Sequence, residues 1–201
     1  MQINFKKFMA TTLVELLAVL SILGVVAALT IPPLKKHSQK TEFAKLAQHA
    51  YTTLENALEM TALDDDTSPD TWGKASDILK NRLTRHIIFA QTCFGQAVPN
   101  ACFSKYTDFA GNTSVSPSGN SAIMMSGVSV LGASTNRKFT IDVNGTQYPN
   151  RRGVDVFTFE YEFANPNCYL SGNDSLKSWK LCPANEDTKK LMENSWTITT
   201  W

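Results

Sequence analysis

Four cysteines carry the most reactive side chains of this sequence: Cys93, Cys102, Cys168 and Cys182. None lies in a CxxC pair, and no histidine stands at a metal-ligand spacing from them, which disfavours a zinc site. An even number of cysteines behind an export-type N-terminus indicates disulfides formed outside the cytosol, four free buried thiols being the alternative. Because near neighbours in sequence meet most easily, we predict that Cys93 pairs with Cys102. On the same argument Cys168 would pair with Cys182, although four cysteines allow three sets of pairs.

A second group with potential chemistry is the set of side-chain oxygens in "IDVNGTQYPNRRGVDVF", residues 141–157. Asn144-Gly145 is a preferred type I′ turn pair, so turn formation is the simplest interpretation. Asp142, Asn144 and Asp155 also offer the clustered oxygens that a hard cation such as calcium needs. The spacing is not that of an EF-hand, and the closing glutamate is missing. Calcium is therefore a secondary hypothesis, and no other metal or cofactor is predicted.

Glu15 is the only acid in the apolar stretch "FMATTLVELLAVLSILGVVAALTIPP", residues 8–33. The residues that follow it, 16–34, carry no charge. As a helix they would span about 28 Å, close to the hydrocarbon thickness of a bilayer. An unpaired carboxylate in such a segment costs about 2 kcal/mol or more. Glu15 therefore needs either a partner or a function.

Two ordinary interpretations explain the apolar stretch incompletely. A cleaved signal peptide would have the basic start at Lys6 and Lys7, but the apolar run is long for one and Glu15 interrupts its beginning. A plain transmembrane anchor fits the length. Its orientation is not settled by charge, because lysines flank the run on both sides. The cysteines favour a C-terminal side that faces outwards.

The third interpretation depends on where the chain would be cut. The leader MQINFKKFMA is short and basic and ends in a small residue. With cleavage between Ala10 and Thr11, Glu15 becomes the fifth residue of a hydrophobic helix that also contains Gly24 and Pro32. These features resemble the cleavage signal of type IV prepilins and type II secretion pseudopilins. Ala10 stands where that family usually has glycine, and Thr11 where it usually has phenylalanine.

The resemblance implies a protein inserted once in the bacterial inner membrane, with its head on the periplasmic side. Prepilin peptidase would remove the leader, and an inner-membrane assembly platform would add the chain to a helical filament of pilins outside the cell. In that filament Glu15 would pair with the α-amine of Thr11 on a neighbouring subunit and set the axial register. The resemblance leaves open whether the chain is a major pilin, a minor pilin or a secretion pseudopilin, and whether Thr11 is N-methylated.

The helical pattern continues beyond the apolar run. A stripe at spacings of three and four residues contains Phe43, Leu46, Ala47, Ala50, Tyr51, Leu54, Ala57 and Leu58. The acidic segment 63–70 should end the helix. Pro32 and Pro33 lack backbone donors and predict a kink or a locally melted turn. We expect a leader at 1–10, an apolar helical half at 11–34, an amphipathic half at 35–63, a variable region with a short helix at 64–120, and a sheet with a disulfide-bounded C-terminal region at 121–201.

Strand-like runs occupy 121–131, 137–143 and 154–163, and a second helix is predicted within 71–91. In the last run Asp155, Phe157, Phe159, Tyr161 and Phe163 share one face, and we expect this largely aromatic face to pack on the long helix. The predicted fold class is therefore α+β. A long N-terminal helix, with a hydrophobic and an amphipathic half, packs on an antiparallel sheet to form a pilin-like head.

Composition argues against several other functions. The formal charge of +1 over 201 residues, without a basic block outside the N-terminal flanks, gives no support for nucleic-acid binding. The sequence contains no GxSxG, HExxH or P-loop motif, so we do not predict an enzyme. The remaining alternatives are a type II secretion pseudopilin, and a membrane-anchored extracytoplasmic binding protein or enzyme that never polymerises.

Overall fold

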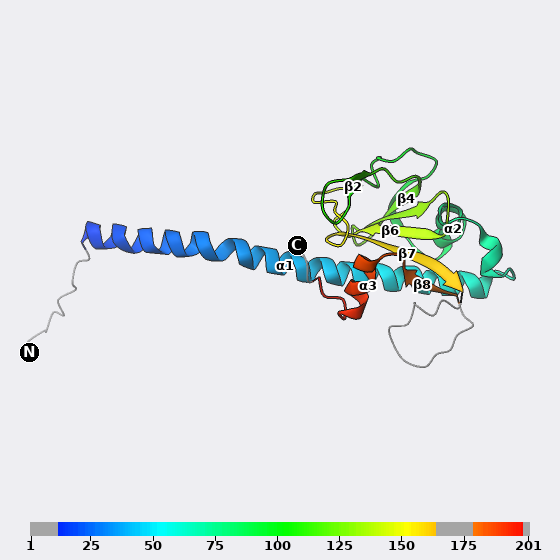
Figure 1. Cartoon of the computed structure of the whole chain (residues 1–201), viewed down its shortest axis with the longest axis horizontal. Helices are drawn as coiled ribbons and strands as arrows, with labels where there is room; N and C mark the ends of the chain where they lie inside the picture. The colour runs from blue at the N-terminus through cyan, green and yellow to red at the C-terminus, as the bar shows by residue number, and fades with distance from the viewer. Residues whose placement is uncertain (1–11, 164–178, 199–201) are drawn as a thin grey trace, which may run out of the picture. The chain divides into compact units, whose positions relative to one another are not determined.

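The computed structural model describes residues 12–163 and 179–198, and the chain divides into two compact units, Met1–Gln39 and Lys40–Trp201. The helical elements are α1 (Leu13–Asp64), η1 (Pro69–Trp72), α2 (Ala75–Asn81), η2 (Leu83–Arg85) and α3 (Glu186–Glu193). The strands are β1 (Phe89–Cys93), β2 (Tyr106–Thr107), β3 (Ser114–Val115), β4 (Gly119–Met124), β5 (Ser129–Ala133), β6 (Lys138–Asp142), β7 (Val156–Phe163) and β8 (Trp179–Pro183) (Figure 1). The α+β fold class predicted from the sequence is confirmed.

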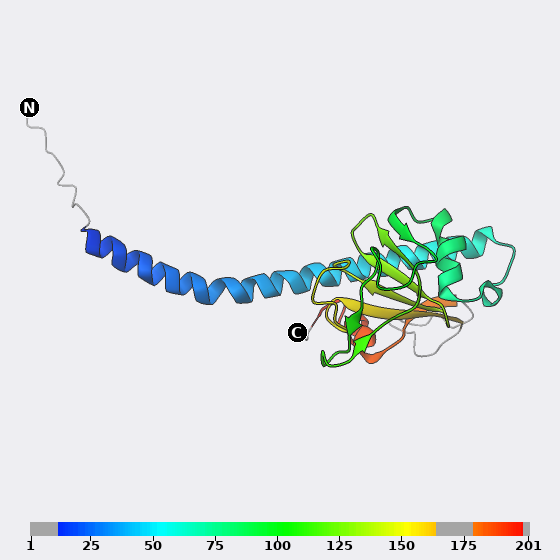
Figure 2. The same cartoon turned by 90° about the horizontal axis from the view of Figure 1, so that it is seen from above.

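Helix α1 is continuous through Pro32 and Pro33 (Figure 2). Proline in a helix removes one backbone donor, so the carbonyls of Ala28 and Leu29 lose the amides that would normally reach them. The fixed φ of proline is itself compatible with a helix, and the locally melted turn considered for this pair is not seen. The helix ends at Asp64, within the acidic segment 63–70 that was predicted to end it.

Six antiparallel strands form the main sheet in the order β1-β4-β5-β6-β7-β8. The run 121–131, taken as one strand from the sequence, is in fact part of a hairpin. Gly127 lies in the turn between β4 and β5 with φ 85°, a left-handed conformation that glycine adopts without strain. Strand β1 comes from the 64–120 region, where the sequence suggested only a helix and loops, and pairs with β4 at one edge of the sheet.

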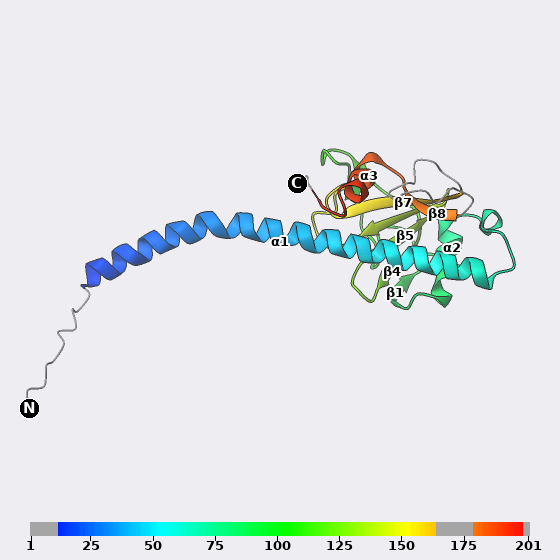
Figure 3. The ribbon, with the colours of Figure 1, turned by 90° about the horizontal axis from the view of Figure 1, so that it is seen from below.

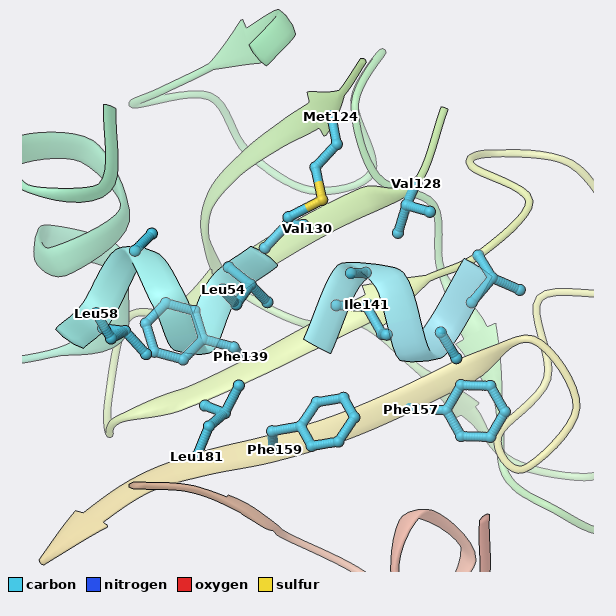
Figure 4. Close-up of a cluster of buried hydrophobic side chains, with 14 of the residues drawn as sticks. Leu54, Leu58, Met124, Val128, Val130, Phe139, Ile141, Phe157, Phe159 and Leu181 are labelled. Atoms are coloured by element: carbon cyan, nitrogen blue, oxygen red, sulfur yellow. The ribbon is translucent and has the colours of Figure 1, made fainter. Parts of the chain in front are cut away.

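The C-terminal half of α1 packs across one face of this sheet (Figure 3). Its buried residues are Phe43, Ala44, Ala47, Ala50, Leu54, Ala57, Leu58 and Thr61. They meet Phe139, Ile141, Phe157, Phe159 and Leu181 from the strands (Figure 4). The rings of Tyr51 and Phe159 lie 5.3 Å apart between centroids. The predicted packing of the aromatic face on the long helix is confirmed for Phe157, Phe159 and Tyr161. Phe163, at the end of β7, is 51% exposed, and Asp155 lies just before the strand, outside this core.

Helix α2 is shorter than the helix predicted within 71–91. It ends at Asn81, and the chain then turns through η2. Residues 89–93 cannot continue a helix, because they form strand β1 and pair with β4. Its N-terminus lies against β5 so closely that a Cβ at Gly132 would meet the carbonyl oxygen of Ala75 at 2.4 Å. Only glycine fits at this crossing.

The opposite face of the sheet carries smaller and more polar side chains. The hydroxyls of Thr140 in β6 and Thr158 in β7 lie 3.3 Å apart there. The side chain of Tyr106 in β2 hydrogen-bonds to Thr140, and nearby Phe103 is fully buried. The segment before β4 therefore covers this face, and the sheet lies between that segment and α1.

Candidate functional site

The N-terminal end of α1 is organised by two residues. The backbone amide of Thr12 donates to Oε2 of Glu15 at 2.8 Å, and the amide of Glu15 donates to Oγ1 of Thr12 at 3.3 Å. These reciprocal bonds are a capping box, which satisfies two amides that a helix start otherwise leaves unpaired. The spacing Thr12-x-x-Glu15 matches the sequence signature of such a box. Ala10 and Thr11 lie outside the described residues, and with them the predicted cleavage and the amine partner of Glu15.

The segment that follows Glu15 presents an apolar surface. Every large apolar side chain between Leu13 and Leu34 is more than half exposed. Two hydroxyls interrupt the surface, and both are satisfied within the helix: Ser21 donates to the carbonyl of Leu17 at 2.8 Å, and Thr30 to that of Val26 at 2.9 Å. Such internal bonding suits a polar side chain in lipid. The helix is long and apolar enough to cross a membrane.

A disulfide joins the end of β1 to the segment that follows it. Cys93 and Cys102 are bonded with their Cα atoms 6.0 Å apart, as the sequence predicts. Cys182 in β8 is also disulfide-bonded. Cys168, its predicted partner, lies outside the described residues. Disulfides persist mainly in oxidising compartments.

A buried polar cluster lies at the end of β6 and in the turn after it. Asp142 and Asp155 are both fully buried. Asp155 accepts the backbone amides of Asn150 at 2.7 Å and Arg151 at 2.6 Å, and it is also hydrogen-bonded by the side chain of Asn144. The fold thus brings together the three residues that the sequence suggested as oxygen donors.

The cluster is electrostatically unusual. Burial, with the charge of Asp155 as a smaller cause, raises the pKa of Asp142 to about 9. Burial also raises the pKa of Asp155, against the opposing effect of the amides that donate to it. Within the described ranges no group of three or more His, Cys, Asp or Glu side chains could hold a metal. Any cation here would depend on amide and hydroxyl oxygens as well as these two carboxylates.

The turn is also fixed from outside. The Arg151 guanidinium donates to the carbonyl of Phe109 through Nε at 2.7 Å, and its ring contact with Phe109 has the guanidinium carbon 5.7 Å from the centroid. Arg152 pairs with Asp187 of α3, Nε to Oδ2 at 3.5 Å. These contacts hold residues 150–155, and therefore Asp155, between the β2–β3 hairpin and α3.

Comparison with known proteins gives the chain no family. No family model, no curated protein and no solved structure matches it. Two features therefore remain as candidates for function: the apolar N-terminal segment with its single acid, and the buried cluster around Asp142.

Proposed function

We propose that this chain is a structural subunit of a type IV pilus-like filament. It is inserted in the bacterial inner membrane as a prepilin, cut between Ala10 and Thr11 by prepilin peptidase, and assembled through its N-terminal helix by an inner-membrane platform. The head lies in the periplasm before assembly and outside the cell in the filament. In this proposal the charge of Glu15 pairs with the α-amine that cleavage creates at Thr11 of a neighbouring subunit.

The observation that carries the proposal is the surface of α1 before residue 35. It exposes apolar side chains all around the helix, its hydroxyls are bonded internally, and Glu15 at its beginning is the only charge. Such a surface is stable in lipid or against similar helices, and not in water. A carboxylate at one end then supplies the single polar contact that can fix how neighbouring helices align.

The capping box does not compete with this pairing. A carboxylate has two oxygens and room for about four hydrogen bonds. One bond to the Thr12 amide leaves capacity for an amine from a neighbouring chain. The local bond also holds the carboxylate at the start of the helix, next to the proposed cleavage point.

Two alternatives keep the same N-terminal segment. A type II secretion pseudopilin would share the processing and the helix, and would differ in the filament that it joins. A membrane-anchored protein that never polymerises would need neither cleavage nor a pairing role for Glu15. The disulfide Cys93–Cys102 fits all three, since each places the head outside the cytosol.

The proposal is tested by asking whether the processed chain occurs in filaments. Sheared surface filaments are probed by immuno-electron microscopy with an antibody against residues 104–120, and the protein in them is analysed by mass spectrometry. We expect labelled filaments and a chain that begins at Thr11. An Ala10→Leu variant should retain its leader and run about 1 kDa heavier. Full-length protein that begins at Met1 and is absent from every filament contradicts the proposal.

A further inference from the structure

We propose that the head binds a calcium ion through side-chain oxygens of Ser129, Asp142 and Asn144, with Asp155 supplying the second negative charge. The inference is independent of the proposed filament, because all four residues belong to the unit Lys40–Trp201. The sequence suggested Asp142, Asn144 and Asp155 as oxygen donors, and the structure adds Ser129. The register of the sheet brings Ser129 next to Asp142.

The sheet places Ser129 beside Asp142. The two residues are direct partners in the β5–β6 ladder, and directly opposed residues point to the same face of a sheet. This is the face opposite α1, because the neighbouring Ile141 belongs to the core under the helix. A Cβ at Gly145 would lie 3.8 Å from Oγ of Ser129, so the serine hydroxyl also lies next to the turn that holds Asn144.

Each of these residues has a buried oxygen without a hydrogen-bond partner. The atoms are Oγ of Ser129, Oδ1 of Asp142 and Oδ1 of Asn144, and none has a hydrogen-bond partner within residues 12–163 and 179–198. The backbone amide of Asn144 also interacts with the carboxyl group of Asp142. Ser129 and Asp142 are completely buried. Burying one polar atom without a partner costs about 1–3 kcal/mol, so three together require an explanation. One cation bound between these three oxygens would satisfy all of them.

Neighbouring polar atoms of the cluster already have hydrogen-bond partners. The Nδ2 of Asn144 donates to the carbonyl of Tyr148 at 3.0 Å, which directs its Oδ1 away from that bond. The side-chain amide of Asn150 is oriented with its nitrogen facing two acceptors. This nitrogen donates to Oδ2 of Asp142 at 2.9 Å and to the carbonyl of Gln147 at 2.6 Å. The free oxygen of Asp142 is thus fixed in orientation by the bond to the other one.

A proton on Asp142 is the competing explanation. It would remove the repulsion between the two carboxylates and could be donated to one neighbouring oxygen. A proton on Asp142 can serve only one of the two remaining oxygens, Oγ of Ser129 or Oδ1 of Asn144. The second of these stays without a partner unless the Ser129 hydroxyl rotates to become a donor. A divalent cation neutralises both carboxylates and also takes the amide and hydroxyl oxygens as ligands. Calcium fits better than magnesium, which demands strict octahedral geometry and usually keeps several waters.

Calcium binding is measured on the full chain in detergent micelles. Thermal unfolding is followed with EDTA, with about 1 mM calcium, and with the same concentration of magnesium. If calcium binds well below that concentration, we expect it to raise Tm by about 5 °C or more, and magnesium to raise it much less. Titration calorimetry should find one calcium site.

Two variants locate the site. Asp142→Asn keeps the side-chain shape and should abolish the calcium-dependent rise in Tm. Ser129→Ala removes one ligand with little effect on folding and should weaken calcium binding about tenfold, which keeps the test decisive if Asp142→Asn does not fold. Asp108→Asn is the matched control, since Asp108 binds the amide of Asn112 in another turn, and calcium should stabilise this variant as it does the wild type.

The outcomes separate the two explanations. An equal Tm in EDTA and in calcium, with no heat of binding, overturns the proposal and leaves the proton as the explanation. A calcium effect of wild-type size in both Ser129→Ala and Asp142→Asn also overturns it, because the ion would then bind elsewhere.

Discussion

Thr12 and Glu15 each accept a hydrogen bond from the other's backbone amide, at 3.3 and 2.8 Å, and this pair begins the long helix. Glu15 therefore has a local role in addition to the intermolecular role that we propose. The two roles depend on different properties of the side chain. Capping needs an oxygen that accepts a hydrogen bond, whereas pairing with an amine needs a negative charge.

Thr12→Ala tests the local role. The substitution removes the hydroxyl that accepts the Glu15 amide and leaves the Glu15 carboxylate in place. We expect faster hydrogen exchange in the first turn of α1, a loss of about 1 kcal/mol of local stability, and filament yield close to that of the wild type. A complete loss of filaments in Thr12→Ala would mean that the start of the helix, and not the charge of Glu15, is what assembly requires.

Leu54→Ala tests the packing of α1 on the sheet. Leu54 is completely buried between α1 and the strands, so its truncation should lower the free energy of unfolding by about 2–5 kcal/mol. Leu63 lies on the same helix and is 80% exposed, and Leu63→Ala should change stability by less than about 0.5 kcal/mol. Denaturant unfolding of both variants in micelles gives the comparison. Equal losses would contradict the packing described for α1.

The disulfide Cys93–Cys102 should contribute measurable stability. It closes a short loop, with a sequence separation of 9, and the chain-entropy model gives about 2–3 kcal/mol for a loop of this size. A variant with serine at both positions should lose about that much in denaturant unfolding under oxidising conditions. Unchanged stability would show that the segment after β1 is held in place by its packing alone.

Stability without divalent cations should fall as the pH rises. The pKa of Asp142 is raised to about 9 in the folded chain, mainly by burial, against about 3.9 when unfolded. Between these values the folded state holds a proton that the unfolded state has released. The free energy of unfolding therefore decreases with pH, by at most about 1.4 kcal/mol per unit.

The measurement for this prediction is Tm in EDTA at several pH values between about 5 and 8, a window that lies between the two pKa values. The wild type and Asp108→Asn should lose stability across this range, and Asp142→Asn should lose less, because only the raised pKa of Asp155 remains in the cluster. Equal slopes in wild type and Asp142→Asn would contradict the prediction. Calcium should bind more tightly as the pH rises, because its binding displaces the proton from Asp142.

Local patterns in the sequence were sufficient for much of the fold. The stripe from Phe43 to Leu58 predicted the buried face of α1, because helical spacing alone decides which side chains share a face. The pairing of Cys93 with Cys102 followed from their proximity in sequence. The alternation of residues 154–163 correctly predicted which side of β7 meets the helix.

Other features depend on contacts between distant segments. Nothing near Phe89 indicates that it begins an edge strand, because the pairing of β1 with β4 decides this. Arg151 donates to the carbonyl of Phe109, 42 residues away. Ser129 joins the cluster around Asp142 only through the register of β5 and β6, which no local motif specifies. Nonlocal pairing therefore completed the candidate calcium site.

The filament incorporation of Glu15→Gln tests the central claim most directly. Glutamine keeps an oxygen for the Thr12 amide but has no charge with which to pair an α-amine. Glu42→Gln is the control, since Glu42 is an exposed acid on the same helix beyond the apolar segment. Sheared filaments from each strain are quantified by immunoblot, with membrane insertion measured in parallel. We predict normal membrane insertion for both variants, wild-type filament yield for Glu42→Gln, and at least a tenfold loss for Glu15→Gln, about 1.4 kcal/mol or more per subunit contact. Wild-type filament yield from Glu15→Gln would contradict the account.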